Sequence, residues 1–115
     1  MNIKKTIGKT EHGHVFICST CQMIHFEFKN LNYNFRDEED YLHFADYFLR
    51  LDGKFWESTN EDIFFKRKII VPGGFSDFNI LLNLEELMEL KALFSGSICE
   101  ERSPVRASYT FFHNN

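Results

Sequence analysis

Apolar and polar residues alternate on both sides of the dipeptide Ser19-Thr20, which gives this stretch a strong two-residue periodicity. Such alternation predicts strands with one buried face, and a two-residue spacer between two runs predicts an antiparallel hairpin. In that register Cys18 faces Cys21 and His14 faces His25. One face carries the polar and sulfur-bearing side chains: His12, His14, Phe16, Cys18, Cys21, Met23, His25 and Glu27. The other face is more apolar, and we expect it to be buried: Val15, Ile17, Gln22, Ile24, Phe26 and Phe28.

A helical periodicity follows the acidic run 37–40. Apolar residues recur there at three- and four-residue intervals, which predicts a helix over residues 37–51 that ends near Asp52-Gly53. Four consecutive carboxylates resemble a metal or substrate cluster. Acidic residues in a first helical turn also interact favourably with the helix dipole, and we prefer this explanation.

A second helix is predicted over residues 84–95. Asn83 and Glu86 have the three-residue spacing of a capping box, and Gly96 can end the helix. Its apolar stripe consists of Leu84, Leu87, Leu90 and Phe94.

Short apolar runs predict three further strands, at 31–35, 63–71 and 75–82, with turns at Lys29-Asn30 and Pro72-Gly73-Gly74. The first eleven residues are polar, and we expect a loosely held lead-in. A shift of 47 positions aligns the two halves weakly, each running strand, turn, strand, helix. The predicted fold class is α+β, with a single antiparallel sheet and two helices packed on one face.

Residues 1–96 are predicted to form one domain with the Cys-x-x-Cys hairpin near its start. Residues 97–115 are predicted to be a tail. Its aromatic patch 109–112 can pair as an edge strand or dock onto a partner.

The composition bounds the class of protein. The chain has 115 residues, 43% of them hydrophobic, and fourteen phenylalanines, which is enough for one domain with a real core. A net charge of -4 provides no overall field to attract nucleic acid. No apolar run has the length of a membrane span, and the first residues lack the apolar core of a signal peptide. Together with three cysteines, these features lead us to expect a cytoplasmic protein.

Cysteine and histidine are typical zinc ligands, and Cys-x-x-Cys is a common half of a zinc site. Cys18 and Cys21 are therefore candidate ligands, with His14 and His25 as weaker candidates. In a flat hairpin these histidines are about 13 Å from the cysteines, too far for bonds of about 2.0–2.3 Å. A zinc site then requires the loop to bend into a knuckle, or a ligand from Cys99, His43 or His113.

Two other interpretations of the cysteine pair remain open. Both thiols can be reduced and packed as small hydrophobic groups. They can also form a cross-strand disulfide or a redox pair, although no βαβ pattern of the thioredoxin type follows them.

Three stretches carry a resemblance to a known family: Gly-His-Val-Phe-Ile-Cys-Ser-Thr-Cys, the segment from Phe26 to Glu39, and Asn-Ile-Leu-Leu-Asn-Leu-Glu-Glu-Leu-Met-Glu-Leu. The chain resembles, over roughly residues 12–95, a family of small uncharacterised bacterial proteins that is a domain of unknown function. Cys18 and Cys21 match its cysteine motif, and the resemblance implies no substrate.

No catalytic constellation is evident, so we expect a non-enzymatic binding or accessory module that acts through protein contact. A first alternative is a zinc-stabilised module associated with nucleic acid, which would use Lys66, Arg67 and Lys68. A second alternative is a thiol-based redox protein or an enzyme with a cysteine nucleophile and a histidine base. In the flat register these groups are beyond hydrogen-bond reach.

Overall fold

The computed structural model describes residues 3–75 and 77–102. Its main sheet is an antiparallel meander in which consecutive strands are neighbours. The four strands are β1 (Ile3–Lys9), β2 (Gly13–Cys18), β3 (Ile24–Phe28) and β4 (Leu31–Phe35). A separate two-stranded sheet contains β5 (Ile69–Phe75) and β6 (Phe78–Leu82). The α+β class is confirmed, and the prediction of a single sheet is wrong.

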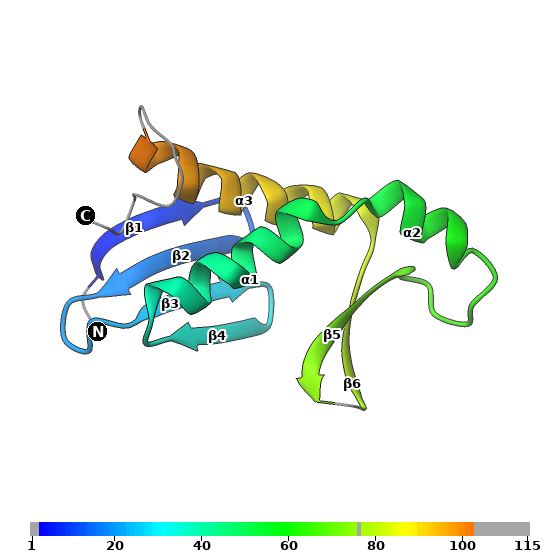
Figure 1. Ribbon diagram of the computed structural model, residues 1–115, viewed down its shortest axis with the longest axis horizontal. Helices are drawn as coiled ribbons and strands as arrows, with labels where there is room; N and C mark the ends of the chain where they lie inside the picture. The colour runs from blue at the N-terminus through cyan, green and yellow to red at the C-terminus, as the bar shows by residue number, and fades with distance from the viewer. Residues whose placement is uncertain (1–2, 76, 103–115) are drawn as a thin grey trace.

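Two of the three helices cover one face of the main sheet, with α3 over β1 and β2 and α1 beside β4 (Figure 1). The helices are α1 (Glu38–Arg50), α2 (Gly53–Thr59) and α3 (Leu84–Arg102). Helix α2 and the β5–β6 hairpin extend from the other end of this layer (Figure 1). The expected packing of two helices is therefore confirmed only in part, because a short third helix, α2, was not predicted.

The core lies between the main sheet and helices α1 and α3. Phe26 of β3 stacks on Phe94 of α3, with ring centroids 5.4 Å apart, and Phe44 meets both rings edge-on. Four of the six residues predicted for the buried hairpin face are buried, namely Val15, Ile24, Phe26 and Phe28. Ile17 is half-buried, and the prediction for Gln22 is wrong because this residue lies exposed in the loop. The remaining buried apolar side chains include Ile7, Tyr41, Phe48, Ile69, Val71, Leu87, Leu90 and Leu93.

Side-chain caps begin both long helices. The Asp37 side chain accepts a hydrogen bond from the Glu39 N–H at 2.9 Å, at the start of α1. At α3, the Asn83 side chain accepts from the Glu86 N–H at 2.7 Å and Glu86 accepts from the Asn83 N–H at 2.9 Å. The predicted capping box is confirmed.

Several predicted boundaries are wrong at the two ends of the chain. The expected lead-in is strand β1, which pairs with β2 and buries Ile7. Its lysines concealed it, because exposed charges are common on edge strands. Gly96 does not end α3, which continues to Arg102. The tail predicted at 97–115 thus begins as helix, and the aromatic patch 109–112 lies outside the described residues.

The middle of the chain also departs from prediction. Residues 63–68 are not part of a strand, and β5 instead includes Pro72-Gly73-Gly74, which was predicted to be a turn. A register irregularity between Pro72 and Phe75 accommodates these residues, as is usual for proline in a hairpin strand. Gly74 has φ 98°, a conformation that glycine adopts readily.

The predicted repeat exists in the order of the elements but not in their packing. β3-β4-α1 and β5-β6-α3 both run strand, turn, strand, helix. The first hairpin belongs to the four-stranded sheet, whereas the second is a sheet of its own.

Candidate metal centre

Cys18 is the last residue of β2 and Cys21 lies in the loop between β2 and β3, which is longer than predicted. His14 faces Glu27 and Phe16 faces His25, a slip of two residues from the expected register. This slip keeps every side chain on its predicted face, because side chains alternate with a period of two. It also leaves residues 19–23 outside both strands, so the prediction of a two-residue turn is wrong.

Hydrogen bonds close this loop into a compact knuckle. The Cys18 N–H donates to the Met23 carbonyl and the Gln22 N–H donates to the Cys18 carbonyl, both at 3.1 Å. Gln22 has φ 61°, in the left-handed region. A two-residue hairpin turn favours Gly or Asn, and Ser19-Thr20 provides neither, which accounts for the wider loop.

The knuckle brings three metal-binding side chains together. The sulfurs of Cys18 and Cys21 and a ring nitrogen of His25 all lie within 4.8 Å of one another. Cys21 Sγ lies 3.4 Å from His25 Nε2. Both cysteines are free thiols, with Cys18 buried and Cys21 exposed. The bent loop thus brings a histidine nitrogen close to both sulfurs, which a flat hairpin cannot do.

The orientation of His25 is set by the neighbouring strand. His25 pairs with Asn34 of β4, and its Nδ1 lies 2.6 Å from Asn34 Oδ1. Asn34 donates from its amide nitrogen to Asn32 Oδ1 at 3.2 Å, which assigns Oδ1 as the atom facing His25. Nδ1 then carries the proton, and Nε2 presents its lone pair toward Cys21. Metal-bound histidines are commonly held by such a hydrogen bond.

Cys18 has the electrostatics of a ligand thiolate. Its sulfur lies 3.0 Å from the Thr20 hydroxyl and accepts the Cys21 N–H at 3.4 Å. The Thr20 hydroxyl, and after it the Cys21 N–H, lower the pKa of the Cys18 thiol to about 6. The thiolate is the form that binds metal.

The structure places the other predicted ligands away from this cluster. His14 Nε2 lies 3.1 Å from the Thr6 hydroxyl, and burial, followed by the charge of Lys9, lowers its pKa. His43 is exposed on α1. The Cys99 side chain and His113 lie outside the described side chains. Within residues 3–75 and 77–102, the group consists of Cys18, Cys21 and His25.

Two sulfurs and one imidazole nitrogen fit zinc by the chemistry of the donors. Structural zinc sites have four ligands, so one further donor is required. Asn34 and Thr20, which orient His25 and Cys18, were missed by sequence reasoning. The Lys29-Asn30 turn was correctly predicted, and its two-residue spacing alone places Asn34 opposite His25.

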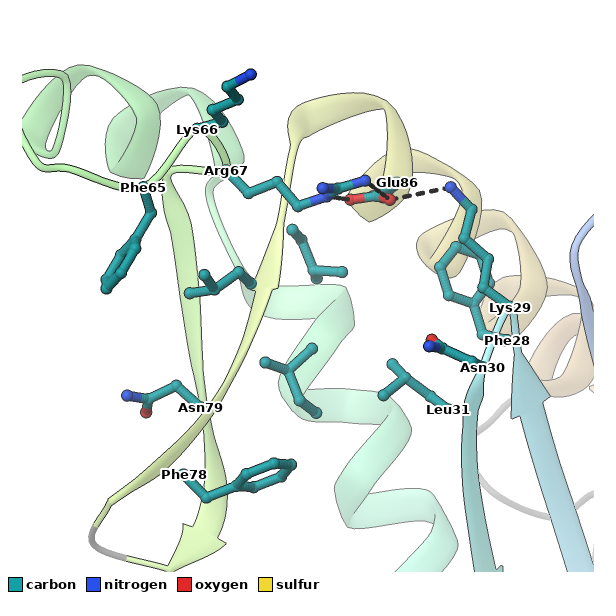
Figure 2. A pocket seen from close by; sticks show the side chains of 13 residues that line it. Phe28, Lys29, Asn30, Leu31, Phe65, Lys66, Arg67, Phe78, Asn79 and Glu86 are labelled. Carbon is teal, nitrogen blue, oxygen red and sulfur yellow. Dashed lines mark hydrogen bonds and ion pairs between the residues drawn. The ribbon is translucent and has the colours of Figure 1, made fainter.

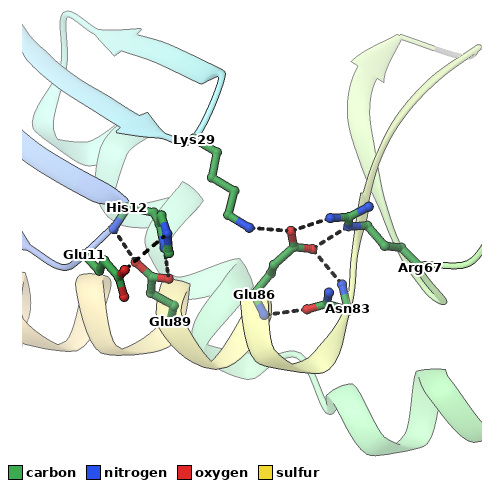
Figure 3. A network of polar contacts seen from close by, with 7 residues as sticks. All are labelled: Glu11, His12, Lys29, Arg67, Asn83, Glu86 and Glu89. Carbon is green, nitrogen blue, oxygen red and sulfur yellow. Dashed lines mark hydrogen bonds and ion pairs between the residues drawn. The ribbon is translucent and has the colours of Figure 1, made fainter.

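Two residues of the basic triplet, which the nucleic-acid alternative would use, have partners within the protein, and Figure 3 shows those of Arg67. Arg67 donates to both oxygens of Glu86, at 2.7 and 2.9 Å, and Lys68 donates to the Ile63 carbonyl at 2.9 Å. Glu86 also accepts from Lys29 at 2.9 Å. Arg67, more than any other neighbour, lowers the pKa of Glu86 to about 2.

The chain belongs to a family of unknown function, DUF6686, whose model matches residues 1–114. The resemblance to a family of unknown function is thereby confirmed, and the match also includes the tail that the resemblance left out. No curated protein and no solved structure matches the chain. Among the described residues, no helix combines the length and the apolar character needed to cross a membrane.

Proposed function

We propose that this protein is a non-enzymatic binding module that acts through contact with another protein and whose β2–β3 loop is fixed by zinc. The observation that carries the zinc site is the convergence of Cys18, Cys21 and His25 within 4.8 Å. A reducing cytoplasm, where the thiols remain available to metal, is the location that fits this proposal.

Zinc would act here as a structural clamp. It would join the last residue of β2 to a residue of β3 through the loop between them, and binding would stabilise the folded state because the unfolded chain has no preformed site. Asn34 would hold His25 in the ligating tautomer, and the Cys21 N–H would support the Cys18 thiolate. Cys21 is exposed, so water or a group from the partner can supply the fourth ligand.

Removal of one ligand tests the zinc site, with a matched histidine as control. His25→Asn is expected to abolish zinc binding, whereas His14→Asn, on the same sheet face but outside the cluster, should retain one zinc per chain. Elemental analysis of the purified protein measures the content. Chelation should lower the melting temperature of the native protein by about 5 °C or more, and should leave His25→Asn unchanged. A native protein without zinc would contradict the site.

A second candidate function is favoured by one contact. Cys21 Sγ and His25 Nε2 are 3.4 Å apart, the arrangement of a thiol with an adjacent base. The geometric objection that followed from the flat register is therefore wrong. Alkylation rates of the cysteines, measured first in the metal-free protein and then with added zinc, distinguish the two functions. Thiol chemistry predicts that His25→Asn slows alkylation of Cys21 severalfold, whereas a structural zinc site predicts that zinc protects both cysteines equally.

Protein contact is tested by recovery of a partner from native lysate, followed by a high-salt wash. We expect a stoichiometric protein. Nucleic acid recovered without protein would favour the alternative role, although Arg67 and Lys68 already have partners within the chain. Contacts to phosphate weaken steeply with salt, so the wash separates the two outcomes.

A further inference from the structure

A groove of about 570 Å³ lies between the β3–β4 turn and strand β6, and no cysteine lines it (Figure 2). It separates the edge of the four-stranded sheet from the second hairpin. All five residues of β6 line it, and so do Lys29 and Asn30 of the turn. The remaining lining residues are Phe28, Leu31, Phe65, Lys66, Arg67 and Glu86.

The groove combines aliphatic and aromatic surfaces. Leu31, Ile80 and Leu82 line its interior, and Phe65 and Phe78 stand at its side with 49% and 47% of their surfaces exposed. Large aromatic side chains that remain this exposed provide apolar area for a partner.

The charged lining is positive on an otherwise acidic chain. Lys29, Lys66 and Arg67 stand against the single carboxylate of Glu86, a local net charge of +2 where the whole chain carries -4. Arg67 uses two of its five N–H donors on Glu86, and Lys29 uses one of its three. Lys66 extends away from this cluster into solvent (Figure 2). Donors on all three side chains thus remain available to an acidic partner.

Strand β6 provides a template for an extended chain. It pairs with β5 on one side, and in the described part of the chain no strand pairs with its other side. Extended peptides commonly bind by adding a strand to such an edge, with alternate side chains directed into pockets.

We propose that this groove binds an acidic peptide in extended conformation along β6, with carboxylates at Lys29, Lys66 and Arg67 and apolar side chains on Leu31, Phe65 and Phe78. This inference rests on the proposed protein-contact function and specifies the chemistry of the partner. The β6 edge that no described strand covers favours a peptide over single-stranded nucleic acid, because the backbone groups along a strand edge pair with another peptide backbone, whereas nucleic acid binds chiefly through stacking of its bases on aromatic rings.

The test uses a fluorescein-labelled peptide of Glu-Val-Glu-Thr repeats and the full-length protein. The peptide should bind in fluorescence anisotropy, and the matching Lys-Val-Lys-Thr peptide should not. Lys66→Glu is expected to weaken binding about fivefold or more, since it replaces an attraction by a repulsion. The control Lys54→Glu makes the same charge change on α2, outside the groove, and should leave affinity unchanged.

Hydrogen exchange locates the peptide. Saturating peptide should slow exchange of the backbone amides at 78–82, as strand addition requires. Equal binding of the two peptides, an unchanged affinity of Lys66→Glu, protection confined to other residues, or tighter binding of a thymidine oligonucleotide would each overturn the proposal.

Recovery of a protein partner from lysate distinguishes peptide binding in the groove from the broader proposal of a protein-contact function. A lysate protein that Lys66→Glu still recovers in full would overturn the groove but leave the protein-contact function standing. Absence of any protein partner for the native chain would contradict both. Zinc content, the readout of the proposed metal site, should be the same in Lys66→Glu and the native protein, because Lys66 is not part of the cluster.

Discussion

The two hairpins that precede α1 and α3 share an order of elements but differ in what surrounds them. The β3–β4 hairpin lies in a four-stranded sheet and buries Phe26 and Phe28 to 2% and 1% exposure. The β5–β6 hairpin has only two strands, and its Phe78 is 47% exposed. A two-stranded sheet is marginally stable alone, so the second hairpin depends on attachments to the rest of the protein.

Those attachments come from both strands. Ile69 and Val71 of β5 and Ile80 and Leu82 of β6 enter the common core. The Tyr33 hydroxyl of β4 donates to the Gly73 carbonyl at 3.4 Å. Arg67, just before β5, is bound to Glu86 of α3. The same order of strand, turn, strand and helix can therefore produce a hairpin inside a larger sheet or a separate hairpin with a groove beside it.

The largest difference between the hairpins should appear on truncation of their phenylalanines. Phe26→Ala removes a ring that stacks on Phe94 and should cost about 3–5 kcal/mol of unfolding free energy. Phe78→Ala should cost less than about 1 kcal/mol because the ring is half exposed. Chemical denaturation measures both. Equal losses would mean that the second hairpin is as integral to the core as the first.

A smaller effect is expected where α3 holds the two hairpins together. Glu86→Gln removes the charge that binds Arg67 and Lys29, and should cost about 1–3 kcal/mol. Glu85→Gln, an exposed neighbour in the same helical turn, is the matched control and should be nearly neutral. If Glu86→Gln is equally neutral, the second hairpin does not depend on this ion pair.

The stabilisation by Glu86 should depend on pH, because the pKa of its carboxyl group is lowered in the folded protein. The pKa of Glu86 is lowered from 4.5 to about 2, so its stabilisation is fully present above the unfolded pKa. It should be lost as the pH falls from 4.5 through about 2. Acid unfolding of the native protein and Glu86→Gln should therefore converge in this range.

The smallest effect on stability is expected where α3 contacts the loop between β1 and β2. Glu89, on α3, accepts from the His12 backbone N–H at 2.7 Å and lies 2.9 Å from His12 Nδ1 (Figure 3). The hydrogen bond to Glu89 raises the pKa of His12 above 6.5. Its stabilisation is thus fully present below the unfolded pKa and lost as the pH rises through the folded pKa.

His12→Gln should accordingly lower the melting temperature slightly in mild acid and hardly at all in mild alkali. His43→Gln on α1 provides the control and should be neutral at both pH values. A loss that grew as the pH rose would contradict the assigned direction.

The candidate metal site could be predicted from the sequence because its residues lie within one short segment of the chain. Cys18 and Cys21 are recognisable by their spacing, and alternation places His25 on the same hairpin face. It could not choose between His14 and His25, because the strand register depends on the conformation of the loop. A left-handed Gln22 and two backbone hydrogen bonds determine that conformation, and neither has a strong sequence signal.

The same distinction between local and long-range interactions explains which helix caps and strands were predicted correctly. Asn83 and Glu86 were assigned correctly because the two hydrogen bonds of a capping box span only three residues. Strand β1 was missed because a polar edge strand is defined by the neighbour with which it pairs.

The sequence by itself determined the α+β class, the faces of the paired strand residues in the first hairpin and the starts of α1 and α3, because each follows from periodicity or from contacts within a few residues. Only the tertiary structure decided that His25 joins the two cysteines, that β5 and β6 form a separate sheet, and that a basic groove lies beside them. Each of these depends on residues distant in sequence, whose meeting is governed by register and core packing rather than by local propensity.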